Sequence, residues 1–170
     1  MVANLRPMQP GDRDCLVTIT SATGFFRQEE IEVAREVLTE AAEKGEASGY
    51  RVRVAADGEQ PLGYVCFGPT PLTRSTWDIY WLAVDPQLQH QGLGSKLMRQ
   101  AESEICQCSG RLVLAETSSQ DLYKPTHRFY LSRGYREVSR IPDFYDVGDD
   151  KVTFAKALSA WADGSGPSPP

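Results

Sequence analysis

The sequence predicts an α/β fold in which a mixed central sheet is flanked by helices. Two observations support this prediction. Residues 50–56 alternate between polar and apolar side chains, and after the turn Asp57-Gly58-Glu59 residues 62–67 form the returning strand, as expected for a β-hairpin. From residue 78 onward, strand-like segments alternate with segments of helical spacing, and two further strands end the series. This order predicts one sheet that contains both parallel and antiparallel neighbours.

The first fifty residues are predicted to supply two helices. Asp12 precedes residues 13–20 and is expected to cap a helix there, because its side chain accepts hydrogen bonds from N–H groups of the first turn. Residues 29–44 place apolar side chains at helical spacing and end at Gly45, which predicts an amphipathic helix.

Residues 78–85 are the central predicted strand, since they are rich in β-branched and aromatic types and contain no glycine. Pro86 ends the strand, because proline has no N–H group for a ladder. A polar loop with Gly92 and Gly94 follows. The remaining predicted elements are a helix at 95–107, a strand at 112–117, a helix at 123–133, and strands at 135–141 and 150–158 joined by residues 140–150.

The chain has 170 residues, of which 41% are hydrophobic and 24% charged, which suits one globular domain. We expect this domain to occupy residues 1–160. The tail at 161–170 contains the run GSGPSPP and is expected to be disordered. No apolar run approaches the length of a membrane span, and the N-terminus has no hydrophobic signal segment, so no membrane partner is expected.

Cysteine usage and charge exclude further classes. The four cysteines have no C-x-x-C spacing and the chain has only two histidines, so no metal site is expected. Reduced thiols are typical of a cytoplasmic protein. The net charge of −5 argues against a nucleic-acid partner and is compatible with a cationic substrate.

The order of strand, glycine-bearing loop and helix around Gly92 is typical of an anion site. The first N–H groups of a helix lack internal partners, and the helix dipole favours negative charge there. Two common phosphate motifs do not fit. After Gly94 the next glycine is Gly110, which excludes G-x-G-x-x-G, and Lys96 is not placed as in G-x-x-x-x-G-K-[ST].

Two motifs resemble those of the GNAT superfamily of N-acetyltransferases. The run QHQGLG at residues 89–94 directly follows LAVDP at 82–86, and this resembles the family's coenzyme A-binding motif, Q/R-x-x-G-x-G/A after a strand that ends V-x-P. Residues 129–135, FYLSRGY, match the family's second motif, h-Y-x-x-x-G-[FY]. The resemblance covers residues 5 to about 158 and implies the GNAT fold, a first strand at Leu5-Arg6 and acetyl-CoA as cofactor.

The resemblance also implies where the cofactor binds. Backbone N–H groups at the start of the helix would hold the pyrophosphate, and the central strand would pair with the pantetheine where the sheet splays open. The N–H near Leu82 would serve as the oxyanion donor. Tyr123 stands where family members often have an asparagine that holds the pantetheine. The implied cofactor-binding residues are Leu82, Ala83, Val84, Gln89, His90, Gln91, Gly92, Leu93, Gly94, Ser95 and Tyr123.

The catalytic candidates are a tyrosine and two carboxylates. Tyr130 falls on the family's motif tyrosine, which protonates the leaving thiolate; the structural alternative is a buried helix tyrosine. Asp78 on the central strand and Glu116 at the end of residues 112–117 compete as the base that deprotonates the amine. Each is alternatively a hydrogen-bonded acid at a strand end. Alternation places Asp78 on the same face as Tyr80 and Leu82.

Among the predicted sites, the site for the acceptor amine has the weakest sequence signal. Phe25 and Phe26 lie in the loop that family members place over the substrate, although loop phenylalanines also close cores. The other candidates are Tyr80, Phe144 and Tyr145. The predicted function is acetyl transfer from acetyl-CoA to a primary amine of a small molecule or peptide, by direct attack in a ternary complex. The alternatives are a non-catalytic acyl-CoA-binding module and an O-acyl or longer-chain acyl transferase, and the chain is expected to be a monomer or a homodimer.

Overall fold

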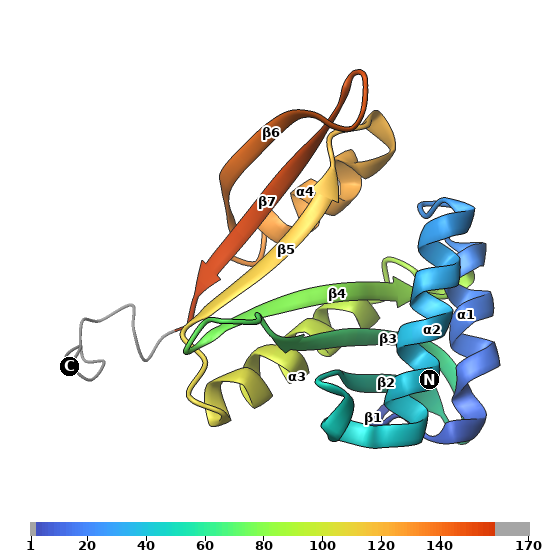
Figure 1. The fold of residues 1–170 in the computed structure, drawn as a ribbon. Coiled ribbons are helices and arrows are strands. Elements are labelled where there is room, and N and C mark those ends of the chain that lie inside the picture. The colour runs from blue at the N-terminus through green and yellow to red at the C-terminus, as the bar shows by residue number, and fades with distance from the viewer. Residues whose placement is uncertain (1–2, 159–170) are drawn as a thin grey trace. The chain divides into compact units, whose positions relative to one another are not determined.

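The computed structural model describes residues 3–158 and contains a seven-stranded sheet in the order β1-β2-β3-β4-β5-β7-β6 (Figure 1). The β4–β5 pair is parallel, whereas β1–β2, β2–β3, β5–β7 and β6–β7 are antiparallel. The predicted mixed α/β sheet is therefore confirmed. The strands are β1 (Asn4–Pro7), β2 (Arg51–Asp57), β3 (Gln60–Pro69), β4 (Thr76–Val84), β5 (Leu112–Ser118), β6 (Arg136–Asp146) and β7 (Asp149–Ala157).

The α-helices follow the predicted positions closely, and short 3-10 helices lie between the main elements. The α-helices are α1 (Arg13–Ala22), α2 (Gln28–Lys44), α3 (Leu93–Gln107) and α4 (Lys124–Leu131). The 3-10 helices are η1 (Pro10–Asp12), η2 (Gly45–Ser48), η3 (Pro86–Leu88) and η4 (Asp121–Tyr123).

The described chain divides into two compact units. Unit 1 comprises residues 3–69 and 80–104, and unit 2 comprises residues 70–79 and 105–158. Strand β4 and helix α3 each contribute residues to both units. The single domain expected over residues 1–160 stays a prediction, and the tail expected at 161–170 lies outside the described residues.

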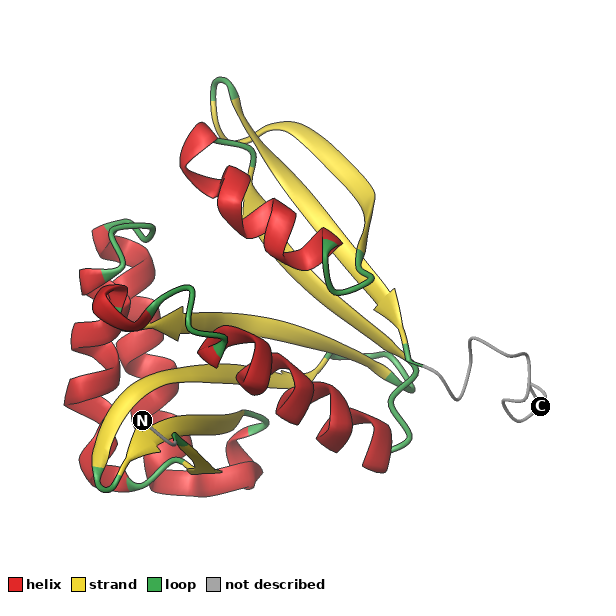
Figure 2. Ribbon diagram, turned by 180° about the vertical axis from the view of Figure 1, so that it is seen from behind, coloured by secondary structure: helices red, strands yellow, loops and turns green. Residues whose placement is uncertain are grey.

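Unit 1 packs helices against both faces of its strands. The run RVRV in β2 buries Val52 and Val54 and leaves the arginines partly exposed, as period-two alternation requires. The valines join Leu16 of α1 and Leu38 of α2 in one apolar core. Helix α3 covers the opposite face of these strands, as Figures 1 and 2 show together.

A charged cluster of unit 1 joins β2 to α3. The guanidinium of Arg53 donates from Nε and Nη2 to the two carboxylate oxygens of Glu104, each at 2.6 Å. Gln100 donates to the same carboxylate at 2.9 Å. Glu104 is buried, so this bidentate pair supplies the hydrogen bonds that a charge needs inside a protein.

Asp12 stands directly before α1, as predicted, but its side chain makes no capping hydrogen bond. Its carboxylate accepts two hydrogen bonds from Arg6, at 2.6 and 2.9 Å, and one from the N–H of Gln9 at 2.7 Å. The predicted capping role is therefore wrong. A bidentate hydrogen bond from a guanidinium is stronger than a capping hydrogen bond from a backbone N–H, so the carboxylate binds Arg6 instead.

Unit 2 contains β5, β6, β7 and the first half of β4, with α4 on one face. The linker predicted at residues 140–150 is wrong, since β6 continues to Asp146 and only Val147-Gly148 separates it from β7. Pro142 lies inside this strand, where proline is normally unfavourable. The pairing of β6 with β7 shifts register between Ile141 and Asp146, which accommodates a residue without an N–H group.

Candidate active site

The loop between β4 and α3 is fixed by contacts at the end of the strand. The N–H of Asp85 donates to the carbonyl oxygen of Leu62 at 2.9 Å, and its carboxylate accepts from the N–H of Gln87 at 2.9 Å. The side chain of Gln89 donates to the carbonyl of Val84 at 3.3 Å. Gln89 thus ties the loop back to the strand that it leaves.

Gly92 forms the last residue before α3 and adopts a φ of +83°, a region that favours glycine. The first hydrogen bond of the helix runs from the N–H of Lys96 to the carbonyl of Gly92, at 3.0 Å. The N–H groups of Leu93 and Gly94 therefore have no acceptor inside the helix.

A Cβ on Gly92 would meet nothing within 4 Å, so the space beside these donors is open. His90 and Gln91 in the same loop are exposed. The arrangement fits a phosphate group.

The strand residues predicted to contact the cofactor lie beyond the β4–β5 ladder. This ladder runs from Thr76↔Leu112 to Ile79↔Ala115, which covers four of the nine residues of β4. Leu82, Ala83 and Val84 follow it. Their backbone lies close to β3, since a Cβ on Gly63 would stand 2.7 Å from the carbonyl oxygen of Ala83. Pairing of Leu82–Val84 with a pantetheine stays a prediction.

Strand β4 departs from regular alternation just before these residues. Tyr80 and Trp81 are consecutive, yet both pack against the same core of unit 1, and their ring centroids are 6.4 Å apart. Consecutive side chains of a regular strand point to opposite faces. The shared face expected for Asp78, Tyr80 and Leu82 therefore does not follow from strand geometry alone.

Asp78 is half-buried in unit 2 and is oriented by a neighbouring hydroxyl. The Thr70 hydroxyl donates to Oδ2 of Asp78 at 2.7 Å. Burial raises the pKa of Asp78 above the ordinary aspartate value, the Thr70 hydrogen bond lowers it, and the negative charge of Glu116 raises it, with a net increase. A carboxylate with a raised pKa is a stronger base, which suits deprotonation of an amine.

Glu116 has a different environment, because it is exposed and paired. Its carboxylate lies 3.0 Å from the ammonium of Lys151, and the Lys151 Nζ stands 4.5 Å from the ring centroid of Phe144. Thus Glu116 is engaged by a fixed counter-ion, whereas Asp78 is hydrogen-bonded only by a neutral hydroxyl among the contacts described for it.

Tyr130 of α4 is 5% exposed and packed among aromatic rings. Its ring stacks on Phe154 at a centroid distance of 5.7 Å and meets Tyr135 edge-on at 5.3 Å. Within residues 3–158, no hydrogen-bond partner of its hydroxyl is found. Burial raises the pKa of Tyr130 well above the ordinary tyrosine value, so the hydroxyl keeps its proton at neutral pH.

Tyr130 and Asp78 flank the last β4–β5 pair. Phe154 contacts Tyr130 and therefore points toward α4. It pairs with Ala115, which pairs in turn with Ile79, so these side chains share one face. Asp78 precedes Ile79 in β4 and points to the other face. The acid and base candidates thus lie on opposite sides of the same strands of unit 2.

The remaining predicted residues belong to separate surfaces. Phe26 packs against the core of unit 1, and Phe25 is partly exposed beside it in the α1–α2 loop. Phe144 and Tyr145 of β6 stack edge-on at 5.0 Å in unit 2. Tyr123 ends η4 at the start of α4, where its N–H donates to the carbonyl of Gln120 at 2.8 Å.

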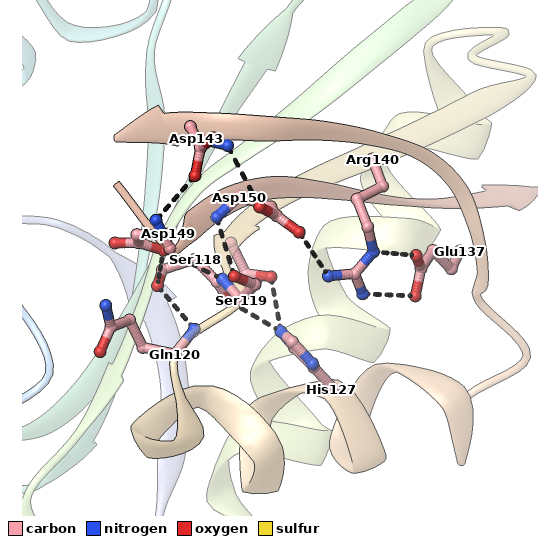
Figure 3. Close-up of polar contacts among 11 residues, drawn as sticks. Ser118, Ser119, Gln120, His127, Glu137, Arg140, Asp143, Asp149 and Asp150 are labelled. Carbon is pink, nitrogen blue, oxygen red and sulfur yellow. Dashed lines mark hydrogen bonds and ion pairs between the residues drawn. The ribbon is translucent and has the colours of Figure 1, made fainter. Parts of the chain in front are cut away.

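Sequence reasoning missed a polar cluster at the end of β5 (Figure 3). The Nε2 of His127 lies 3.0 Å from the carbonyl oxygen of Ser118 and 2.9 Å from the hydroxyl of Thr117. A carbonyl oxygen only accepts, so Nε2 carries the proton and does not act as a base toward Thr117. Ser118 in turn donates to Asp149 at 2.5 Å. The partners are distant in sequence, so no local pattern indicates this cluster.

The described residues contain neither a metal-binding cluster nor a membrane-spanning helix. Within residues 3–158, no three His, Cys, Asp or Glu side chains gather so as to hold a metal ion. None of the described helices combines the length and the apolar character that a membrane crossing needs.

The chain is similar to known proteins in sequence and in fold. A family model described as an acetyltransferase (GNAT) domain matches residues 48–137. A solved structure from Desulfovibrio desulfuricans, assigned to the GNAT family, is 37% identical, with a TM-score of 0.90 over 93% of this chain and 100% of that chain. No curated protein sequence matches the chain.

Two more distant structures share the fold. The protein yncA from Salmonella typhimurium, solved with its cofactor acetyl-CoA, is 21% identical, with a TM-score of 0.77 over 95% of this chain and 97% of that chain. The ribosomal-protein-S18-alanine N-acetyltransferase from Escherichia coli is 18% identical, with a TM-score of 0.72 over 93% and 95% of the two chains.

Proposed function

The chain belongs to the GNAT acetyltransferase family, and on this premise we propose that it transfers the acetyl group of acetyl-CoA to a primary amine. The acceptor is a small molecule or a peptide, and the amine attacks directly in a ternary complex. Acetyl-CoA, when bound, supplies the acetyl group as an activated thioester. The observation that carries the proposal is the open, donor-lined start of α3 beside Gly92.

The backbone at the start of α3 would bind the pyrophosphate of the cofactor. The N–H groups of Leu93 and Gly94 and the positive end of the helix dipole favour an anion there. Gly92 leaves room for the anion to approach the backbone. Beyond the loop, Leu82–Val84 would pair with the pantetheine, and the N–H near Leu82 would donate to the thioester carbonyl oxygen.

Of the two carboxylates, we assign the base role to Asp78. The acceptor amine must be neutral to attack, so a proton has to leave its nitrogen. Asp78 has the raised pKa that favours taking this proton. Glu116 is held by Lys151, and removing its counter-ion to bind a substrate ammonium costs free energy.

Tyr130 is assigned the acid role, donating its proton to the sulfur as the C–S bond breaks and the N–C bond forms. Its raised pKa makes it a weaker acid than tyrosine in water. Burial keeps this hydroxyl protonated at neutral pH, as the acid of the transfer must be. The four free cysteines among the described residues fit a reducing compartment, so we expect the reaction in the cytoplasm.

The proposed cofactor site is tested by substituting two glycines that both have a positive φ. Gly92 and Gly58, in the β2–β3 turn, both have positive φ, +83° and +58°, and open space where a Cβ would lie. Gly92→Glu should abolish acetyl-CoA binding in calorimetry, because it adds strain, bulk and negative charge where the phosphates bind. Gly58→Glu adds the same strain elsewhere and should leave binding intact. Unchanged binding by Gly92→Glu would refute the cofactor site.

A screen of amines for acetyl-CoA-dependent thiol release tests the transfer itself. Thiol release with an amine, together with formation of an amide, supports the proposed reaction. Binding of acetyl-CoA without turnover on any primary amine identifies a binding module instead. Turnover with alcohols, or with longer acyl donors only, identifies the other acyltransferase classes.

A further inference from the structure

We propose that Thr70 and Lys151 are positioning residues that select Asp78, and not Glu116, as the proton acceptor of the transfer. The inference rests on the proposed function. It assigns roles to two residues that do not belong to the family motifs, and both lie in unit 2 with the two carboxylates.

Asp78, Glu116 and Lys151 lie on the neighbouring strands β4, β5 and β7, and Thr70 lies in the loop that follows β3. Asp78 of β4 is paired with Leu114 of β5, and Glu116 lies two residues beyond Leu114 on the same face. From strand spacing and rise, the Cα atoms of Asp78 and Glu116 are about 8 Å apart. Thr70 contacts Asp78, and Lys151 contacts Glu116.

Thr70 is held in place before any substrate arrives. Its N–H donates to the carbonyl of Thr76 at 2.9 Å, and its carbonyl accepts from the hydroxyl of Thr73 at 2.8 Å. The Thr70 hydroxyl is thus presented to Oδ2 of Asp78 by a fixed loop. This hydrogen bond leaves Oδ1 of Asp78 as the oxygen that would face the amine or a bridging water.

Lys151 acts on Asp78 through Glu116. The Lys151 side chain is 18% exposed and lies between the Glu116 carboxylate and the Phe144 ring, so its ammonium is fixed. The Lys151 ammonium partly cancels the field of the Glu116 carboxylate at Asp78. Without Lys151, the full charge of Glu116 would favour the protonated form of Asp78, which cannot accept a proton from the amine.

Within residues 3–158, one charged group acts on Asp78 strongly enough to shift its pKa. Glu116 is the ionisable group that acts on it directly, and Thr70 is its hydrogen-bond donor. Trp77 and Ile79, its neighbours in β4, are apolar and buried. The protonation of Asp78 is therefore set by burial, by Thr70, and by the net charge of the Glu116–Lys151 pair.

The experiment follows the Asp78 carboxyl carbon by NMR titration in ¹³C-aspartate-labelled protein, with Asp78→Asn to assign the signal. Thr70→Val should move the midpoint of Asp78 to higher pH, because the donor to the ionised form is lost, whereas Thr70→Ser should keep the wild-type midpoint. Lys151→Met should also raise the midpoint. Glu116→Gln should lower it, and Lys151→Met should have less effect when added to Glu116→Gln.

The same variants are then assayed with acetyl-CoA and the best amine of the screen. Thr70→Val and Lys151→Met should lose kcat/KM mainly at low pH, and Glu116→Gln should retain turnover. Midpoints that do not move in Thr70→Val and Lys151→Met overturn the inference, as does loss of turnover in Glu116→Gln with retention in Asp78→Asn. Absence of any amine turnover by the unmodified protein defeats the proposed function instead, so the two failures are distinguishable.

Discussion

Tyr130 and Asp78 lie on opposite faces of the strands in unit 2, next to the last β4–β5 pair, Ile79 and Ala115. Transfer between two bound partners needs an acid at the leaving group and a base at the nucleophile. These groups act on opposite ends of the reacting atoms. The sulfur and the nitrogen are bonded to one carbon during transfer, so with Tyr130 as the acid on one face, the amine proton would have to reach Asp78 through bridging water.

Tyr130→Phe should lower kcat/KM by about 100-fold or more, the usual contribution of a positioned acid. The ring packing is kept and no hydrogen bond among the described residues is lost, so the free energy of unfolding and the Kd for acetyl-CoA should not change. Steady-state kinetics, chemical denaturation and calorimetry measure the three quantities.

Tyr64→Phe is the matched control. The Tyr64 hydroxyl is equally buried but lies 2.7 Å from the hydroxyl of Thr20. Its removal should cost about 1 kcal/mol of stability and leave turnover intact. The same turnover in Tyr130→Phe and in the unmodified protein would remove Tyr130 from the mechanism.

Asp78→Asn should lose turnover and gain stability at neutral pH. The folded pKa of Asp78 lies above its unfolded value, so the folded state binds the proton more tightly. As pH rises through this window, ionisation of the buried carboxyl lowers the stability of the unmodified protein. Asparagine does not ionise, so the variant should have a higher Tm than the unmodified protein at pH 7. This difference in Tm should disappear toward pH 3, where Asp78 is also protonated.

Asp14→Asn gives the opposite sign and serves as the control. The Asp14 pKa is lowered by its contact with Arg13, and the side chain is exposed. The variant should therefore gain no thermal stability at pH 7 and should keep full activity. A Tm of Asp78→Asn equal to or below that of the unmodified protein would contradict the assigned environment.

Glu104→Ala should destabilise the fold by roughly 3 kcal/mol, because the partly buried Arg53 guanidinium loses its bidentate, buried partner and keeps the exposed Glu46 at 3.4 Å. The comparison is Glu40→Ala, which removes an exposed partner of Lys44 at 2.7 Å and should cost under about 0.5 kcal/mol. Urea denaturation measures both. The two pairs have similar distances, so equal losses would show that burial does not decide their contributions.

His127→Gln should remove part of the pH dependence of stability. Burial lowers the pKa of His127 below its ordinary value. As pH falls below about 6.5, this histidine binds a proton in the unfolded chain more readily than in the folded state. The free energy of unfolding therefore falls with pH. The variant should show a flatter unfolding free energy between pH 8 and pH 5. The other histidine, His90, lies in an exposed loop, and His90→Gln should keep the steep profile.

The sequence was sufficient for the elements whose signals are local. Hydrophobic periodicity placed the helices and most strands, and the motifs at 82–94 and 129–135 indicated the family that the comparisons confirm. The first strand implied by that resemblance is β1.

The errors arose where the deciding partner is distant or the chain is irregular. The position of Asp12 in the sequence is that of a helix cap, and its ion pair with Arg6 becomes apparent only in the folded chain. Residues 140–150 include Pro142, which is unfavourable inside a strand, and the compensating register shift is a property of the pair of strands. Likewise, Thr70 and Lys151 become recognisable as neighbours of the carboxylates only when the β3–β4 loop and the strands β4, β5 and β7 are brought together.

The irregular middle of β6 bears on what this sheet edge can bind. Strand β6 is the outermost strand, and an exposed edge normally offers a template on which another chain can add. Here Pro142 has no donor to offer, and Asp143, with a φ of +51°, turns the backbone away from extended geometry. An incoming strand would meet an interrupted row of donors and acceptors, so uninterrupted cross-β growth from this edge is blocked at its centre.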